Sequence, residues 1–472
     1  MRTKLLALAD LAQKEQKEIY IVGGFVRDAL RGIPSWDVDL VVTEEAEQFA
    51  KRAAWRMRGE YEMLDSQSQY SRIFLVASDG RPFSLDLTLV HGGKLEDDLK
   101  RRDFTVNAMA VSLNNYLHAP DWQESVIDPC GGKEDLHVGR LRLTTEECIL
   151  RDPVRLFRSA RFLLRLGLQF CPDTLAVLKK NAGQIRYAQK MKLSMELFQL
   201  LAQPYAADGM KILQDELDVL THFFAPFARM NQVIVEGEAV FAHGLEVCRA
   251  LEKILGENYC LTSELLHKLH AHLRQKVAGN RPRLSFLRLA CILHDIGKVD
   301  GVQCERAKQS FNHEIAAEAY IGSLAQRLCF TQEEEMYLIR LICNHSRPLY
   351  TREVDLGANL RFFRQFGDTV PELVLLSMAN LVARHGMDAM RCRELSCLLD
   401  DYFAGKYATL PEPVISAREI MEFFNLPPTR AIGKYLEAVY AAQLEGRVKN
   451  SGEALSLVSI LLEARNKGGE DT

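Results

Sequence analysis

The hydrophobic pattern of the chain changes near residue 145, and this change constrains the fold more than any other feature. Before it, short apolar runs are bounded by Gly, Pro, Asp or Ser, as β-strands commonly are. These runs are IYIVGG, VDLVV, SRIFLVA and FSLDLTLV. After it, long segments repeat apolar residues at helical spacing, and few strand-like runs occur. We therefore predict an N-terminal α/β domain followed by an all-helical remainder.

The chain of 472 residues is too long for one ordinary hydrophobic core. We place an α/β head at residues 1–145, a helical neck at 146–235, a helical body at 236–405 and a helical tail at 406–472. The two later boundaries rest on LTHFFAPFARMNQVIVEGEAV and on the proline-containing stretch YATLPEPVISA. The first segment, MRTKLLALADLAQKEQKEIY, is typical of an amphipathic helix rather than of a secretion signal.

Composition narrows the classes of function. The net charge of −4 predicts no general affinity for nucleic acid, so any such site has to be a local basic patch. The 11 cysteines include no CxxC pair, which favours reduced thiols in the cytoplasm and argues against structural zinc. The chain has no run of about 18 apolar residues, so we expect no membrane span and no membrane partner.

Two aspartates interrupt the apolar run WDVDLVV. Asp37 and Asp39 are two residues apart, so in a strand both carboxylates face the same side. Two neighbouring anions repel each other, and a divalent cation such as Mg²⁺ removes that cost. Asp86 in FSLDLTLV is a third candidate, because adjacent strands could bring it to the same metal. A DxD pattern alone is more often a solvated strand edge or a turn, so its context has to decide.

The context is a pair of glycines upstream of the aspartates. Gly23 and Gly24 follow the first apolar run and precede FVRDALRG, which has a helical pattern. Glycines in a strand-to-helix turn let backbone N–H groups approach an anion, and Arg27 would add a phosphate donor. The stretch is neither a Walker loop nor a GxGxxG fingerprint. A phosphate cradle beside a two-carboxylate metal site suggests phosphoryl or nucleotidyl transfer.

Several motifs together resemble a known family. They are GGFVRD, the DxD about ten residues later, LEDDLKRRDFTVNAMA (95–110), IDPCGGKEDL (127–136) and RDPVRLFRSARFLLRLG (151–167). In these motifs the chain resembles the class II tRNA nucleotidyltransferases and bacterial poly(A) polymerases, over about its first 200 residues. The resemblance implies a polymerase-β-like palm followed by a helical neck.

The resemblance also implies a reaction: the 3′-hydroxyl of an RNA attacks the α-phosphate of a nucleotide and releases pyrophosphate. Two Mg²⁺ ions would be held by Asp37 and Asp39, with Asp86 as a third catalytic carboxylate. The residues implied to hold the triphosphate are Gly23, Gly24 and Arg27, and those implied to fix the sugar and phosphates are Arg102, Asp103 and Asn107.

The RDPVRLFRSARFLLRLG segment carries arginines at 151, 155, 158, 161 and 165, a spacing that predicts one helix face. Such a stripe needs anions nearby, either acidic side chains of a neighbouring helix or a bound nucleotide. The resemblance implies that Asp152 and Arg155 read the incoming base, Asp152 accepting from an exocyclic amine, with Arg158 and Arg161 in the same nucleotide site. Arg151 stands where the family usually has glutamate.

The connection between FSLDLTLV and LEDDL is short, only His91 to Lys94. CCA-adding relatives have a longer flexible loop there, and its deletion is characteristic of CC-adding enzymes. We therefore predict addition of CC to tRNA 3′ ends from CTP. The alternatives are full CCA addition, which also uses ATP and would need another loop to substitute, and poly(A) synthesis.

CILHDIGK carries a second metal-ligand pattern. His294 and Asp295 are adjacent, so they converge on one cation only if a helix end kinks. Further candidate ligands are His243, His313 and His345, and together these residues resemble the HD superfamily of metal-dependent phosphohydrolases. The set suits a transition metal or Mg²⁺. Asn380 stands where that family has its last aspartate, which weakens the prediction of a hydrolase.

The predicted architecture is thus a polymerase-β-like α/β palm, an all-α neck, an HD-type helical body and a helical tail that contacts tRNA. A phosphohydrolase whose N-terminal domain only regulates is an alternative from another class. A uridylyltransferase that modifies a regulatory protein is a third hypothesis. The arginine-rich helix favours the tRNA enzyme, and we see no ACT-like β-repeats, which would favour the third hypothesis. The sequence does not indicate an oligomeric state.

Overall fold

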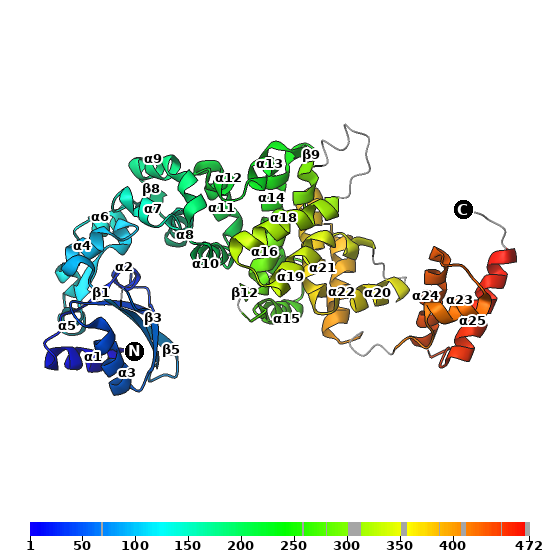
Figure 1. Cartoon of the computed structure of the whole chain (residues 1–472), viewed down its shortest axis with the longest axis horizontal. Helices are drawn as coiled ribbons and strands as arrows, with labels where there is room; N and C mark the ends of the chain where they lie inside the picture. Colours follow the sequence, from blue (N-terminus) through cyan, green and yellow to red (C-terminus); the bar gives the residue numbers. More distant parts are fainter. Residues whose placement is uncertain are drawn as a thin grey trace. The chain divides into compact units, whose positions relative to one another are not determined.

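The computed structural model describes residues 1–67, 69–256, 259–279, 281–300, 313–350, 356–386, 388–406, 412–444 and 446–467. The chain forms two compact units (Figure 1). Unit 1 comprises Met1–Leu200 and Asp208–Ala225, and unit 2 comprises Leu201–Ala207 and Pro226–Thr472. The finer division into head, neck, body and tail stays a prediction.

Unit 1 begins with a six-stranded mixed sheet in the order β3-β4-β5-β2-β1-β6. The strands are β1 (Ile19–Val22), β2 (Asp37–Val42), β3 (Glu60–Asp65), β4 (Tyr70–Val76), β5 (Pro82–Leu89) and β6 (Ala110–Ser112). The β2–β5 pair is parallel and the other pairs are antiparallel. The four predicted strands are confirmed, whereas β3 and β6 lie outside the apolar runs that the sequence singled out.

Helices cover one face of the sheet and leave part of the other open. The first face packs against α1 (Arg2–Lys14), α3 (Ala46–Met57) and α5 (Leu113–His118). Along β2 the residues Val38, Leu40 and Val42 are buried in this core, while Asp37 is exposed. This alternation with period two is what directs both aspartates of β2 away from the core. The amphipathic helix predicted at the N-terminus is confirmed as α1.

A smaller apolar cluster occupies the other face beside β1 and β2. It joins Val22 and Val41 of these strands to Leu95 and Leu99 of α4 (Leu95–Lys100). The chain then continues into η2 (Thr105–Asn107) and, later, α6 (Gly132–His137). Packing of α4 therefore places the Arg102–Asn107 segment next to the turn between β1 and α2 (Gly24–Leu30).

The arginine-rich segment is not one helix. α7 (Glu147–Arg151) ends before Asp152, whose backbone is non-helical (φ −144°, ψ 89°), and α8 (Arg155–Leu166) begins after Pro153. The residue before a proline is disfavoured in the α region, which explains the break. The prediction of a single five-arginine helix face is therefore wrong: Arg151 belongs to α7. The rest of unit 1 is formed by α9 (Pro172–Lys180), η4 (Ala182–Tyr187), most of α10 (Lys190–Leu201) and α11 (Ala206–Lys211), η5 (Ile212–Glu216) and α12 (Val219–Phe223).

Unit 2 is helical over its described residues, apart from two short strand pairs, β9–β10 (Ile234–Val235, Glu238–Ala239) and β11–β12 (Lys276–Val277, Arg281–Pro282). Its helices are α13 (Pro226–Gln232), α14 (Val240–Leu255), α15 (Ser263–Leu273), α16 (Arg283–Leu293), α18 (His313–Leu328), α19 (Gln332–Cys343), α20 (Leu356–Phe366), α21 (Val370–His385) and α22 (Ala389–Phe403). Helices α14, α16 and α21 pack against one another and form its centre.

One stretch of this unit, Phe362–His385, is apolar and long enough to span a membrane, but 78% of its most apolar window is buried, as expected of a core helix. The last three helices have an apolar cluster of their own. They are α23 (Ala417–Phe424), α24 (Arg430–Leu444) and α25 (Ser451–Lys467), and they share Ile420, Val439 and Val458.

A substitution at Gly132 tests the close contact between α6 and η2 in the head. A Cβ atom at this position would lie 2.1 Å from the carbonyl oxygen of Thr105, a backbone atom that cannot rotate away. We expect Gly132→Ala to destabilise the protein by about 1–3 kcal/mol and to lower its thermal unfolding temperature, measured by circular dichroism.

Gly183→Ala is the matched control, because nothing lies within 4 Å of a Cβ built there. It should leave the unfolding temperature unchanged or slightly higher. Equal unfolding temperatures for the Gly132 variant and the wild-type protein would contradict the close contact between α6 and η2.

Candidate active site

Three carboxylates from two neighbouring strands lie on the open face of the sheet. Asp37 and Asp39 come from β2, and Asp39 stands in register with Asp86 on the parallel strand β5. The apolar residues that alternate with them, Val38 and Leu40 on β2 and Leu85 and Leu87 on β5, are buried on the opposite face. The structure thus brings together the three acids that the sequence indicated, because β2 and β5 are adjacent in the sheet.

Asp39 is the electrostatic centre of this group. Desolvation by burial raises the pKa of Asp39 to about 6, and the charges of Asp37 and Asp86 act in the same direction, while Arg102 and Arg158 oppose them. A set of hard oxygen donors that repel one another fits Mg²⁺, which would relieve the repulsion. The residues that would hold the ion are Asp37 and Asp39.

Asp86 has partners of its own on β4. Arg72 donates to both carboxylate oxygens, from Nε at 2.7 Å and from the NH2 nitrogen at 2.6 Å, and the Tyr70 hydroxyl donates at 2.5 Å. Asp86 is therefore held by an ion pair, which sets it apart from the two acids of β2. Arg72 and Tyr70 are not among the site residues predicted from the sequence, although polar residues at alternate positions of YSRIFLV were a usable signal.

The glycine turn lies against these acids. Gly23 has φ +70°, and a Cβ there would be 2.9 Å from an Arg102 guanidinium nitrogen and 3.4 Å from Asp39 Oδ2. Only glycine adopts this conformation readily and permits this approach. The turn, Arg102 and Asp39 therefore form one continuous surface, as a phosphate cradle beside a metal site requires.

Behind the turn, buried polar residues connect α2 to η2. Arg27 donates from Nε to Asp28 at 2.8 Å and from NH1 to the Asn107 side chain, and Asn107 donates to Asp103 at 3.1 Å. All four residues are buried. In this structure Arg27, Asp103 and Asn107 stabilise the turn from within. Their direct contact with a nucleotide stays a prediction.

The arginines of α8 are compensated by acidic side chains. Arg158 pairs with Asp103 at 2.9 Å, and Arg161 pairs with both oxygens of Glu196 on α10, at 2.9 and 3.2 Å. Burial alone would raise the pKa of Asp103, but Arg158 and Arg155 hold it below the ordinary value. Of the two interpretations left open by the sequence, salt bridging to acidic neighbours therefore accounts for Arg158 and Arg161.

The two implied base-reading residues lie at the start of α8. Arg155 donates to the backbone carbonyls of Arg101 and Arg102, at 3.0 and 3.2 Å, which couples the helix to the RRD segment. Asp152 accepts from the backbone N–H of Val154 at 3.3 Å. The helix break at Pro153 therefore places Asp152 in a loop, with its side chain across the first turn of α8.

The short connection predicted after β5 is confirmed. β5 ends at Leu89, η1 (His91–Gly93) follows, and α4 begins at Leu95. The described head thus has no long loop between its carboxylate strand and the RRD segment.

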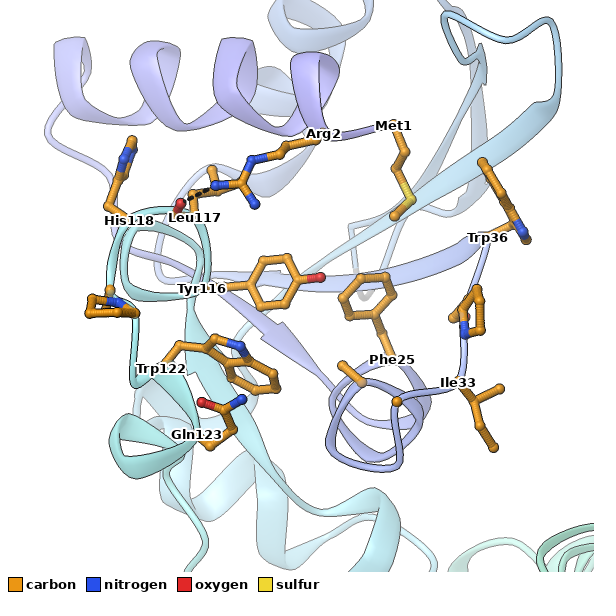
Figure 2. Close-up of a pocket in the computed structure, with 16 residues that line it drawn as sticks. Met1, Arg2, Phe25, Ile33, Trp36, Tyr116, Leu117, His118, Trp122 and Gln123 are labelled. Carbon is orange, nitrogen blue, oxygen red and sulfur yellow. Dashed lines mark hydrogen bonds between the residues drawn. The ribbon is translucent and has the colours of Figure 1, made fainter.

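A pocket of about 650 Å³ lies against the segment that leads into β2 (Figure 2). Its walls include Phe25, Trp36, Tyr116 and Trp122, and the Tyr116 ring makes edge contacts with Phe25 and Trp122 at 5.4 and 5.2 Å. None of the predicted site residues lines it. Its aromatic walls support the segment immediately before Asp37.

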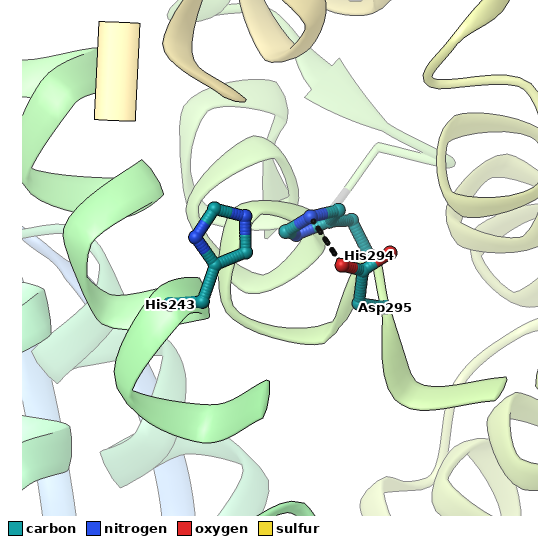
Figure 3. Close-up of side chains that lie close together, drawn as sticks. All are labelled: His243, His294 and Asp295. Carbon is teal, nitrogen blue, oxygen red and sulfur yellow. Dashed lines mark ion pairs between the residues drawn. The ribbon is translucent and has the colours of Figure 1, made fainter. Parts of the chain in front are cut away.

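The second metal-ligand pattern forms a cluster inside unit 2 (Figure 3). Ligand atoms of His243, His294 and Asp295 lie within 4.8 Å of one another. α16 ends at Leu293, and His294 and Asp295 follow directly after it, beside His243 of α14. The ring of His345 is 5.0 Å from that of His294. His313 begins α18, and its side chain lies outside the part of the structure that is described.

The imidazoles of His294 and His345 are oriented as those of metal ligands usually are. Nδ1 of His294 lies 2.9 Å from the Cys291 carbonyl, and Nδ1 of His345 lies 2.7 Å from the Ile342 carbonyl, so each Nε2 can face the cluster. Burial and His294 lower the pKa of His345 to about 4, which keeps its ring neutral at neutral pH. Asn380 Oδ1 is 3.0 Å from His243 Nε2.

Two cations border the same cluster. Lys298 lies 2.7 Å and Arg384 3.4 Å from Asp295 Oδ2, and Arg384 Nε donates to Asn380 at 3.2 Å. The loss of an acid at position 380 and these cations reduce the negative charge offered to a metal. The sequence indicated that Asn380 replaces an acid in this cluster, but it did not indicate that Lys298 and Arg384 lie beside Asp295.

A mixed sheet with paired carboxylates beside a glycine turn, followed by a helical neck, defines a nucleotidyltransferase with a polymerase-β-like head. Residues 19–142 match the family model described as the poly A polymerase head domain. The chain is therefore similar to poly(A) polymerases in its head and to tRNA nucleotidyltransferases over most of its length.

Several relatives match almost the whole chain. A CC-adding tRNA nucleotidyltransferase of Geobacter sulfurreducens is 26% identical, covering 95% of this chain and 93% of the relative. An A-adding tRNA nucleotidyltransferase of Deinococcus radiodurans is 28% identical, covering 93% and 94%. A Thermotoga maritima CCA-adding enzyme complexed with tRNA has the same fold, with a TM-score of 0.59 at 20% identity over 97% of this chain and 95% of that one.

The raised pKa of Asp39 predicts how the stability of the protein depends on pH. Because its pKa is raised to about 6, the folded state binds a proton between about pH 4 and 6 that the unfolded state has lost. The stability of the metal-free protein should therefore fall as pH rises through this window, by at most about 3 kcal/mol. We expect Asp39→Asn to unfold at a higher temperature than wild type at pH 8 in EDTA.

Mg²⁺ provides the internal control. It should raise the unfolding temperature of the wild-type protein more than that of the variant, because the variant lacks one ligand. If the Asn variant unfolds at a lower temperature than wild type at pH 8 in EDTA, the ionised carboxylate of Asp39 does not destabilise the metal-free protein.

Proposed function

We propose that this enzyme adds CC to tRNA 3′ ends, using CTP and Mg²⁺. The observation that carries the proposal is the short connection between β5 and α4, because the family resemblance implies a longer loop there in CCA-adding enzymes. The CC-adding relatives match nearly the full chain, which supports the proposal, but an A-adding relative does so equally well. Solved structures of the same fold are complexes of CCA-adding enzymes with tRNA, ATP and CTP.

The proposed mechanism assigns each side of the site a task. Mg²⁺, when bound by Asp37 and Asp39, supplies electrostatic activation of the attacking hydroxyl and stabilises the leaving group. The Gly23 turn and Arg102 bind and orient the triphosphate at the edge of the acids. Their donors face the place where negative charge develops on the departing pyrophosphate.

Base selection would be the task of the start of α8. Asp152 accepts from the exocyclic amine of cytosine, and Arg155 donates to its ring acceptors. Both C and A present an amine there, whereas G and U do not present that pattern. Each good contact of this kind discriminates by about 1–3 kcal/mol. The bonds from Arg155 to the RRD carbonyls hold the reading side chains at a defined distance from the phosphate cradle.

A primer-extension experiment tests the specificity. A tRNA that ends at the discriminator base is incubated with CTP alone, ATP alone or both, and a second tRNA that ends in CC is incubated with ATP. We expect two added nucleotides with CTP, the same length with both, and no addition from ATP. Three added nucleotides would indicate CCA addition, a long ladder poly(A) synthesis, and extension of the CC-ending tRNA an A-adding enzyme.

Asp37→Ala should reduce the rate by at least about a thousandfold, because a metal ligand is lost, while its circular dichroism spectrum stays that of the wild type. Asp79→Ala, at an exposed aspartate in the turn between β4 and β5, is the matched control and should retain full activity. Retained activity of the Asp37 variant would contradict the metal assignment.

For the helical cluster we propose a single divalent transition-metal ion bound by His243, His294, Asp295 and His345. Asp295 Oδ1 is buried without a hydrogen-bond partner, and His294 Nε2 lies 3.3 Å from Asp295 Oδ2, as two ligands of one ion would. Imidazole nitrogens with one carboxylate favour late transition metals over Mg²⁺. When bound, such an ion could activate water, so metal-dependent phosphohydrolysis is the second candidate function.

Metal content and affinity test this proposal. The wild-type protein should bind Co²⁺, measured by its visible absorption spectrum, and Asn380→Asp should bind Mn²⁺ about tenfold more tightly, because it restores a carboxylate. His294→Ala should bind neither ion. His267→Ala, at an exposed histidine of α15, is the control and should behave as wild type. Absence of stoichiometric metal in all variants would overturn the assignment.

A further inference from the structure

The open face of the sheet is divided at β2 into two sides. The strand order places β1 on one side of β2 and β5 followed by β4 on the other. Asp39 stands in register with Val22 of β1 and with Asp86 of β5, and Asp86 in turn with Arg72 of β4. The Gly23 turn, which follows β1, lies on the first side, and the Asp86–Arg72 ion pair lies on the second.

Nucleotidyl transfer requires both sides. In an in-line displacement the attacking oxygen and the leaving group lie on opposite sides of the phosphorus. If pyrophosphate leaves toward the Gly23 turn, the attacking 3′-hydroxyl has to approach from the β5 and β4 side. This step rests on the proposed function, because it takes RNA as the second substrate.

We propose that the open face of β4 binds the terminal nucleotide of the RNA acceptor, with Arg72 donating to its phosphate and Phe74 stacking on its base. Neither residue belongs to the motifs that mark the family in this sequence.

Arg72 has donors to offer a phosphate even while it is paired. Its bonds to Asp86 use Nε and the NH2 nitrogen, so the NH1 nitrogen lies outside the pair. The Arg72 side chain is 33% exposed, whereas that of Asp86 is 5% exposed. A guanidinium fixed at one edge and open at another is suited to a second anion, since its planar fork is already oriented.

Asp86 is the positioning residue in this arrangement. It is buried, and its two oxygens accept from Arg72 and from the Tyr70 hydroxyl. Removing Arg72 from it would leave a buried carboxylate unpaired, which is strongly unfavourable. Asp86 therefore fixes Arg72 beside the metal site, and Asp37 and Asp39 remain the ligands that a metal can use.

Phe74 continues this surface along the strand. It lies two residues after Arg72 on the same face and stands in register with Ser84, whose hydroxyl donates to Asp37 Oδ1 at 3.0 Å. Its side chain is 42% exposed, which is unusual for a phenylalanine within a sheet. Exposed aromatic rings beside basic side chains are the usual platform for unpaired bases.

Steady-state kinetics with tRNA and CTP varied separately test the proposal. We expect Arg72→Ala and Phe74→Ala each to raise the KM for tRNA about tenfold, with the KM for CTP unchanged. Arg72→Lys and Phe74→Tyr should recover part of the loss, because they keep the charge and the ring. Arg81→Ala, at an exposed arginine of the β4–β5 hairpin, is the control and should alter neither constant.

Asp86→Asn separates positioning from metal binding. We expect it to raise the KM for tRNA as Arg72→Ala does, with the same Mg²⁺ concentration for half-maximal rate as wild type. An increased Mg²⁺ requirement would make Asp86 a metal ligand and overturn the proposal. A raised KM for CTP in the Arg72 variant would place Arg72 on the nucleotide side and also overturn it.

Photo-crosslinking gives a readout that does not depend on turnover. A tRNA with a photoreactive 3′-terminal nucleotide is crosslinked to the full-length protein, and the modified peptide is sequenced. We expect modification within β4, and crosslinks confined to the Gly23 turn would contradict the proposal. If wild-type protein extends no acceptor, the proposed function fails, and the crosslinked peptide then decides this inference by itself.

Discussion

The repulsion between carboxylates on one face of a sheet is the constraint on which the rest of unit 1 depends. Asp37 and Asp39 face the same side because a strand alternates, and β5 adds Asp86 in register with Asp39. The two acids next to Asp39 have different partners. Asp86 forms an ion pair with Arg72, whereas Asp37 accepts one hydrogen bond, from the Ser84 hydroxyl. The site is therefore asymmetric, because the acid of β5 is paired with an arginine and the two acids of β2 have no such ion pair among the described residues.

The charged residues around the three acids also form pairs that balance positive and negative charge. The Gly23 turn brings Arg102 against Asp39, and the arginines of α8 are balanced by Asp103 and Glu196. These ion pairs link the head to the helices that follow it within unit 1. Arg158 and Arg161 of the basic helix face are thus occupied by internal ion pairs. Asp152 and Arg155, at the start of α8, remain the candidates for contact with a nucleotide.

In the histidine–aspartate cluster of unit 2, charge compensation also decides which ion the side chains favour, but here nearby cations reduce the negative charge. His243, His294 and Asp295 converge because α16 ends where the HD motif begins. Lys298 and Arg384 then compensate the one carboxylate, and Asn380 adds no charge. A cluster rich in neutral nitrogen donors and poor in negative charge favours a softer ion than the sheet site does. We therefore expect the two sets of candidate ligands in this chain to prefer different ions.

The sequence by itself determined whatever depends on neighbours along the chain: the alternation of Asp37 and Asp39, the glycine turn, the short connection after β5 and the adjacent His294 and Asp295. The helix break at Pro153 was also a local signal, and the arginine spacing obscured it. Only the tertiary structure decided that Arg72 pairs with Asp86, that Glu196 pairs with Arg161 and that Arg384 reaches Asp295. These partners are far apart in sequence, so no local pattern specifies which charge neutralises which; packing of the strands and helices makes that choice.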